Sequence, residues 1–350
     1  MRKLLFSLSM IFAILICLLS LSACNIQEVF LPNDREINEP FESISINIAT
    51  ADVNIFPAEE EYARVLTYDS DNLYHSVKIV DGTLVVERVD DRNWFERLSP
   101  NFSEAEVAVY LPEREYHSLD IDASTGNIQI YSGISFGDVD IELSTGDVFY
   151  YATKSESLEI DSSTGDITIA NTSAVDVEIS STTGDVRILD IDCNSISVDS
   201  GNGGITLGEL NIKEKLEIES STGDIHINMI NAGDMELEST TGVIDIFEVE
   251  CSSLVCESGT GDVNLGSMIA SEKIEINSNT GKVLFSMIDS ASISINTTTG
   301  DVIGTLLSGK NFITSSSTVW IDVPASDTRS EEICKIETTT GRIEISIIEE

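Results

Sequence analysis

Apolar and polar residues alternate along most of this chain, in short blocks that are separated by a recurring turn. From about residue 117, a strand, a Ser/Thr-Thr-Gly-Asp turn and a second strand repeat with a spacing of 19 or 20 residues. A degenerate turn at 317–320 lies within the last, longer step, between Gly300 and Gly341, and we expect it to keep the register there. A fixed period of this kind predicts a repeat architecture. The turn glycines are Gly126, Gly146, Gly165, Gly184, Gly203, Gly223, Gly242, Gly261, Gly281, Gly300 and Gly341.

The residues around each glycine explain the period. Aliphatic side chains, mostly β-branched, dominate five and seven residues before the glycine and two and four residues after it, with polar residues between them. Each half of the repeat is therefore a predicted half-buried strand. One unit buries nothing alone, but copies stacked in register place Ile on Ile in an interior ladder.

We therefore predict an all-β fold, a single-stranded β-helix or β-solenoid with 19–20-residue coils over residues 117–350. The usual hand of parallel crossovers favours a right-handed one. An antiparallel β-sandwich with regular hairpins is the alternative, and the constant spacing and column identity favour the solenoid.

Residues 41–116 follow the pattern less strictly. Within them, 43–55 look like one repeat with Ala51 in place of the glycine, and 90–101 form a predicted loop. An open first coil would expose unpaired strand edges, so we interpret 41–116 as an N-terminal β cap. At the other end, we expect Trp320 and the irregular segment 322–332 to close the core.

The N-terminus has the composition of an export signal. Two basic residues precede an apolar run at 4–19, which is short for a membrane span, and Leu-Ser-Ala-Cys then ends at Cys24. This ending resembles a bacterial lipobox, whose cysteine is diacylated and becomes the first mature residue. Two acyl chains anchor a protein stably. We predict a lipoprotein signal peptide at 1–23, lipidation of Cys24, a tether at 24–40 and an extracytoplasmic, membrane-anchored location. An uncleaved anchor helix is the alternative.

The lipobox followed by serial Ser/Thr-Thr-Gly-Asp-(Ile/Val) coils resembles a bacterial family of unknown function whose members are called "putative adhesins". The resemblance covers roughly residues 41–350. It implies a β-solenoid of the cell envelope, and some members are encoded with envelope-stress regulators. The family has no established catalytic residues that could be carried over to this chain.

The charge of the chain limits its partners. The sequence has 19 basic and 61 acidic residues, a net charge of -42. Such a field repels nucleic acid and anionic lipid and attracts cations. Acidic chains are often disordered, but 41% hydrophobic residues in strict alternation argue against that here.

Two acidic columns recur at fixed offsets from the glycine. We expect each Asp to bind turn amides and the second column to be a solvated face. Weak Ca²⁺ binding by the first column is the functional alternative, because hard cations take several carboxylate oxygens. No other cofactor is expected. The first column, directly after the glycine, is Asp147, Asp166, Asp185, Asp224, Asp262 and Asp301. The second, four residues before the glycine, is Asp122, Glu142, Asp161, Asp199, Glu219, Glu238, Glu257 and Glu337.

Other chemistry-bearing residues are sparse. The three histidines are scattered, and no Gly-x-Ser-x-Gly, HExxH or phosphate-loop motif occurs. Coils of constant length leave no long loops to wall a catalytic cleft, so we predict that the chain is not an enzyme, with a polysaccharide-active enzyme as the weakest alternative. We expect buried thiols beyond disulfide reach for the remaining cysteines, which are Cys193, Cys251, Cys256 and Cys334.

The leading functional hypothesis is an adhesin-like or structural surface module that presents flat acidic faces to a protein or to a wall or surface glycan. An accessory or sensor factor in envelope-stress regulation is the alternative. Nearly every regular position is explained by folding, so the sequence leaves function to irregular places.

Overall fold

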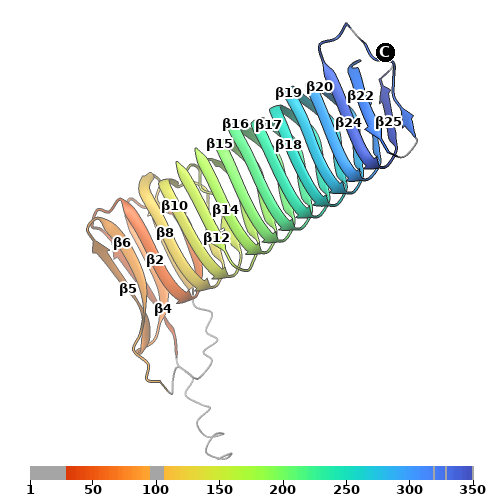
Figure 1. Ribbon diagram of the computed structural model, residues 1–350. Helices are drawn as coiled ribbons and strands as arrows, with labels where there is room; N and C mark the ends of the chain where they lie inside the picture. The colour runs from red at the N-terminus through yellow and green to blue at the C-terminus, as the bar shows by residue number, and fades with distance from the viewer. Residues whose placement is uncertain (1–28, 95–105, 318–319, 328, 349–350) are drawn as a thin grey trace, which may run out of the picture.

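The computed structural model describes residues 29–94, 106–317, 320–327 and 329–348. The regular secondary structure of these residues consists of β-strands, with no helix. The strands wind into one long rod of stacked coils (Figure 1). The predicted all-β solenoid is thus confirmed. The described residues offer no helix that could cross a membrane. Cys24 and most of the predicted loop at 90–101 lie outside the described residues.

Most strands cover one face of a coil, whereas β15 to β20 are long strands that each run from one glycine turn to the next. The strands are β1 (Leu31–Ile37), β2 (Ser43–Thr50), β3 (Asp52–Ala58), β4 (Ala63–Asp69), β5 (Leu73–Val80), β6 (Thr83–Asp90), β7 (Glu106–Pro112), β8 (Glu115–Thr125), β9 (Ile128–Ile130), β10 (Ser135–Thr145), β11 (Val148–Tyr150), β12 (Ser157–Ser162), β13 (Ile167–Ser173), β14 (Asp176–Thr183), β15 (Val186–Asn202), β16 (Ile205–Thr222), β17 (Ile225–Thr241), β18 (Ile244–Thr260), β19 (Val263–Thr280), β20 (Val283–Thr299), β21 (Val302–Leu306), β22 (Asn311–Ser316), β23 (Ile321–Asp322), β24 (Ile333–Thr340) and β25 (Ile343–Ile347).

Parallel pairing in register builds the core. Ile141 on β10 faces Ile160 on β12, which faces Ile179 on β14, and all three are at most 1% exposed. The same ladder continues to the long strands, where β16 pairs with β17 from Ile205 to Thr222. Alternating side chains therefore fill the interior of the rod, as the sequence pattern predicts.

Seven successive coils have a second corner that could not be predicted from the sequence. A non-glycine residue with a left-handed backbone follows the turn glycine by six positions in successive coils. Left-handed geometry is uncommon for such residues and costs most for bulky ones. Met and Glu hold several of these corners, so stacking overrides their local preference. The residues are Asn171, Asp190, Glu209, Met229, Glu248, Ser267 and Met287.

The N-terminal coil lies inside the rod rather than at its end. β2 pairs with β8 on one side and β6 on the other, and β3 likewise lies between β9 and β7. Residues 43–58 therefore form a true first coil, with Ala51 below Gly126 as the repeat predicts. The outermost coil comes later in the sequence, from 83–90 and 106–112.

Antiparallel strands complete the N-terminal end. β5 pairs with β6, β4 pairs with β7, and β1 pairs with β4 over its whole length. β1 falls within the predicted tether at 24–40, so residues 31–37 belong to the cap and not to a linker. The pairing was missed because Pro32 and the charges of β1 give no strand period, although such residues suit an edge strand.

The C-terminal end has the same inverted order, which contradicts the expected position of the degenerate turn. β24 lies between β20 and β22, and β25 lies between β21 and β23. Gly341 accordingly stacks directly on Gly300. The strands on either side of this turn, β22 and β23, belong to the outermost coil and not to a coil between these two glycines. Trp320 is 63% exposed, so it does not close the core as expected. A linear repeat cannot reveal this order, because both positions keep the same register.

Candidate functional site

The acidic column after the turn glycine forms a ladder of hydrogen bonds. The backbone N–H of Asp166 donates to Asp147 Oδ1 at 2.9 Å, and that of Asp185 donates to Asp166 Oδ1 at 2.8 Å. The N–H groups of Gly204 and Val243 donate likewise to Asp185 and Asp224 at 2.8 Å. This contact is the structural role that the sequence analysis preferred for the column.

The two last predicted members behave in the same way. Asp262 Oδ1 accepts the N–H of Lys282 at 2.7 Å, and Asp301 Oδ1 accepts that of Arg342 at 3.0 Å. From Asp185 onward, acidic residues alternate with Gly, Val, Lys and Arg in this column. Alternation separates the carboxylates by two coils and so weakens their mutual repulsion. Among the described residues, no group of three His, Cys, Asp or Glu could hold a metal ion. Weak Ca²⁺ binding stays a prediction.

A second set of carboxylates is concentrated on one outer face near the N-terminal end. We call it the carboxylate face: Asp120, Asp122, Asp140, Glu142, Glu159, Asp161 and Glu178. Asp140 stands directly between Asp120 and Glu159 on neighbouring strands. None of the ion pairs within the described residues involves the seven. Partial burial and the surrounding carboxylates raise the pKa of Glu159, and burial and Asp140 raise that of Asp120.

Lysines relieve this repulsion further along the rod. Lys215 Nζ lies 2.9 Å from both Glu217 and Glu236, and Lys273 Nζ lies 3.3 Å from Glu275. The negative field is therefore strongest over the coils of β8, β10, β12 and β14. The sequence analysis identified the row four residues before the glycine but missed the acidic row six residues before it.

A groove follows the rod axis beside the turns. In the C-terminal half it encloses about 660 Å³, and its walls are the residues four, three and two positions before the glycine in successive coils, from 238–240 to 337–339. Ser315 and Ser317 of the outermost coil extend it. A second hollow of about 290 Å³ uses the same three positions near the N-terminal end, from Asp122 to Thr182. The groove is thus a property of the repeat.

Small buried hydroxyls form the inner wall of this corner. Ser239 and Ser278 are 1% and 5% exposed, and neither Oγ has a hydrogen-bond partner among the described residues. Ser258 Oγ makes a long bond of 3.4 Å to the carbonyl of Gly261. The small side chains let the wall dip inward. This column could not be predicted from the sequence, because a buried Ser next to a turn looks like an ordinary turn residue.

The acidic row is interrupted within the groove. Asn277 and Asn296 replace carboxylates there, and Asn296 Nδ2 donates to Asn277 Oδ1 at 3.1 Å. Beside them, Thr298 Oγ1 donates to Asn279 Oδ1 at 3.1 Å. These four residues, which we call the amide patch, carry no charge between Glu257 and Glu337. The patch therefore offers amide and hydroxyl groups that are already oriented by their neighbours.

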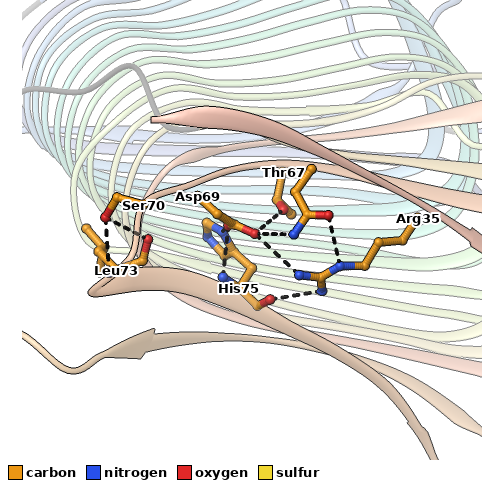
Figure 2. Close-up of polar contacts among 7 residues, drawn as sticks. Arg35, Thr67, Asp69, Ser70, Leu73 and His75 are labelled. Carbon is orange, nitrogen blue, oxygen red and sulfur yellow. Dashed lines mark hydrogen bonds and ion pairs between the residues drawn. The ribbon is translucent and has the colours of Figure 1, made fainter. Parts of the chain in front are cut away.

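A polar cluster joins three strands of the N-terminal cap (Figure 2). Asp69 Oδ1 lies 2.9 Å from His75 Nδ1, and Asp69 Oδ2 accepts hydrogen bonds from Asn33 Nδ2 at 2.7 Å and Arg35 Nη2 at 3.3 Å. Thr67 Oγ1 adds a bond of 3.1 Å to Oδ2. Burial by itself raises the pKa of Asp69, but the hydrogen bonds from His75 and Asn33 outweigh it, and the pKa lies below its ordinary value.

The Asp69–His75 pair resembles two members of a catalytic triad but lacks the third. A triad needs a nucleophile at the far ring nitrogen. His75 is 4% exposed, and its Nε2 has no hydrogen-bond partner among the described residues. The cluster instead attaches β1, which lies within the predicted tether, to β4 and β5.

The cysteines and one lysine are buried. Cys193, Cys251, Cys256 and Cys334 are free thiols, and burial raises the pKa of each to about 12. Lys310 is 0% exposed, and its Nζ contacts the carboxylates of Asp289 and Glu332. The sequence analysis did not single out Lys310, whose burial depends on the inverted order of the last coils.

Similar solved structures include a "putative adhesin" from Bacteroides fragilis NCTC 9343 (12% identity, 91% of this chain and 97% of that chain, TM-score 0.30). A "putative lipid binding protein" from Parabacteroides distasonis ATCC 8503 has 15% identity, the same coverage and a TM-score of 0.32. At these values the likeness carries no argument about function. No curated protein matches the chain.

The family model described as Toastrack DUF4097 matches residues 41–248 and 229–350. The two matches together span nearly all of the repeats and the cap, and they agree with the resemblance noted from the motifs. The chain belongs to the Toastrack DUF4097 family.

Proposed function

We propose that the chain is a lipid-anchored, non-catalytic binding module of the bacterial cell envelope, adhesin-like in its mode of action. The observation that carries this proposal is the groove, whose walls repeat the same polar positions coil after coil. A surface that repeats along a rod suits a long or multivalent partner, because many weak contacts add up. The export signal and the lipobox at Cys24 support an anchored location outside the cytoplasm.

Several features favour binding over catalysis. The carboxylates of Asp147, Asp166 and Asp185 already accept backbone N–H groups. General acid–base chemistry needs carboxylates with separated pKa values in a cleft, and His75 is buried within the cap. The net charge of -42 favours neutral or cationic partners over nucleic acid.

Acylation and retention test the anchor. The full chain would be expressed in a bacterial host fed a clickable fatty acid, beside Cys24→Ser. We expect label and membrane fractionation for the unchanged chain and loss of both for the variant. An unlabelled chain that still sediments with membranes would support the uncleaved helix and contradict the lipid anchor.

Binding is tested with the anchored full chain in vesicles. These vesicles are mixed with isolated cell-wall sacculi and with intact cells, and vesicles that lack the protein serve as the control. We expect protein-dependent co-sedimentation. Equal sedimentation of the two kinds of vesicle would contradict the binding function.

A further inference from the structure

The groove runs across the strands, and this direction restricts what it can hold. Its walls come from equivalent positions of successive coils, so its long axis follows the stacking direction. The backbone groups along the coils are used in pairing between neighbours, as in β18–β19 and β19–β20. An added peptide strand pairs with a sheet edge and not with a sheet face. The occupant must therefore be recognised by side chains.

The spacing of the groups along the groove suits a linear polymer. Neighbouring strands lie about 4.8 Å apart, so one set of polar groups recurs at that interval. This is close to the advance of one sugar ring in an extended β-linked glycan. A glycan lying in the groove would place successive rings over successive coils, and each ring would meet the same kind of group.

The charge pattern selects among glycans. Glu238 and Glu257 flank the groove on one side of the amide patch, and Glu337 flanks it on the other. Like-charge contacts across an interface are unfavourable, so these carboxylates oppose a polyuronate or a sulfated chain. Lys335 Nζ lies 2.8 Å from Glu337, which further reduces the negative charge beside the patch. The groove is least charged at the patch itself.

The amide patch supplies the recognition chemistry. A side-chain amide can both donate and accept hydrogen bonds. In Asn277, Oδ1 accepts the bond from Asn296, whereas Nδ2 makes no bond to the described residues. Asn296 Oδ1 and Asn279 Nδ2 likewise make no hydrogen bond to the described residues and can therefore accept from and donate to a ligand. Donors and acceptors held side by side match the hydroxyl and acetamido groups of a neutral sugar. Their mutual bonds fix the amides before binding, which lowers the entropic cost.

We infer that this groove binds a neutral, extended β-linked glycan along the rod axis, with the amide patch as its central contact. The inference rests on the proposed binding function and names its ligand class. Because the groove has no aromatic platform, binding depends on many hydrogen bonds and strengthens with the length of the chain.

Chito-oligosaccharides test this inference with the full chain in detergent micelles. Binding of the dimer, tetramer and hexamer is measured by calorimetry, beside oligogalacturonates of the same lengths. We expect affinity to rise with each length of the neutral series and no binding of the anionic series. Tight binding of oligogalacturonate, or an affinity independent of length, would overturn the inference.

Two variants locate the site. Asn277→Asp with Asn296→Asp continues the acidic row through the patch, and we expect a loss of about tenfold or more in hexamer affinity. Ser197→Asp with Ser294→Asp adds the same charge on β15 and β20, in the row six residues before the glycine and outside the groove, and should leave affinity unchanged. Unfolding midpoints confirm that both variants fold. Equal losses in the two variants would show a general charge effect and reject the patch.

The glycan test is separable from the test of the binding function. If vesicles carrying the chain bind sacculi or cells while every neutral oligosaccharide fails, the glycan inference is wrong and the binding function stands. If both measurements are blank, both proposals are rejected.

Discussion

The turn glycine is required by the neighbouring coil as well as by its own torsion angles. Gly223 has φ of 144°, and a Cβ added there would lie 1.9 Å from the carbonyl oxygen of Gly203. The same contact recurs at Gly203 on Gly184 and at Gly242 on Gly223, at 1.9 Å and 2.0 Å. The column is therefore a stack of backbone atoms with no room for any side chain. A positive φ is therefore only half of the reason for a glycine at this corner.

Gly223→Ala should strongly destabilise the rod. The new Cβ meets a carbonyl, and the backbone angle is unfavourable for Ala, so we expect a loss of about 2 kcal/mol or more in the free energy of unfolding. Gly204→Ala is the matched control, because its Cβ would find only ordinary contacts, at 3.6 Å and beyond. Urea unfolding of both variants measures the difference. Similar midpoints for the two variants would refute the stacking argument.

The Asp ladder predicts a different pattern of tolerance. Asp185→Ala removes the acceptor for the Gly204 N–H and should cost about 1 kcal/mol. Asp185→Asn keeps an acceptor oxygen, as Asn127 does naturally for Asp147, and should be nearly neutral. Thermal unfolding with Ca²⁺ and with chelator accompanies the two variants. A Ca²⁺-dependent rise in Tm that Asp185→Asn abolishes would favour the cation alternative instead.

The Asp69 cluster makes the cap sensitive to acid. The pKa of Asp69 is lowered in the folded protein, so the unfolded chain binds this proton more readily. The resulting stability is fully present above about pH 4 and is lost as the pH falls through the lowered value. Asp69→Asn should weaken the protection of β1 in hydrogen exchange and cost about 1–2 kcal/mol at pH 7.

The difference between Asp69→Asn and the unchanged chain should shrink as the pH falls through the lowered pKa of Asp69, because the carboxylate then becomes protonated in the folded state as well. Asp71→Asn is the control, because Asp71 is exposed in the adjacent turn. Equal exchange in 31–37 for the two variants would show that the cluster does not hold β1.

At the scale of strands, the stacking that places like side chains beside each other stabilises the core and also brings like charges together on the surface. In-register pairing places every side chain beside its counterpart, which builds the Ile ladders and also the carboxylate face. The two effects have one cause. Lys215 offsets the repulsion by contacting Glu217 and Glu236 on adjacent coils, and Lys273 contacts Glu275. Among the described residues, no ion pair does the same for the carboxylate face.

Glu159→Gln should therefore stabilise the protein. The raised pKa of Glu159 means that its folded state prefers the proton, so its charge lowers stability as the pH rises through that value. We expect Tm to rise by about 2 °C at pH 7 in low salt, with a smaller gain in high salt or below about pH 4.

Glu217→Gln is the matched control for Glu159→Gln, because it occupies the same row but removes a partner of Lys215. It should leave Tm unchanged or lower it. A rise in Tm of the same size in both variants would point to net charge and not to local repulsion.

At the scale of the molecule, the sequence determines the repeating part almost completely and the ends poorly. The Ile ladders, the turn glycines and the first coil around Ala51 follow from period and composition. The inverted coil order does not, because β24 fits the register on either side of β22 equally well by pattern. The groove was also missed, since it depends on a buried Ser row whose members look like turn residues. Side-chain type predicts which face is buried, whereas the order of coils is set by long-range packing.

At each end of the rod, the outermost coil stacks on a coil that lies nearer to the chain terminus in the sequence (Figure 1). A terminal repeat frays when it has a single neighbour. Here the last coil in the sequence is sandwiched, so its contacts hold both itself and the outer coil in place. Within the outer coil, Thr314 and Ser316 occupy interior positions, where they stack on Ile336 and Thr338. Such polar residues suit the end of a core better than its middle.

Removal of residues 333–350 should therefore release the outer coil as well. β22 pairs only with β24 among the described strands, and β23 only with β25. We expect residues 311–317 and 320–322 of the truncated chain to exchange amide hydrogens at the rate of an open loop, while β15 to β19 stay protected. A second, longer truncation that ends the chain after residue 309 should unfold at the same denaturant concentration as the chain that lacks 333–350. If 311–317 instead remains protected after the shorter truncation, the outer coil has moved into the vacated place on β20, and the polar interior of β22 does not confine it to the end of the rod.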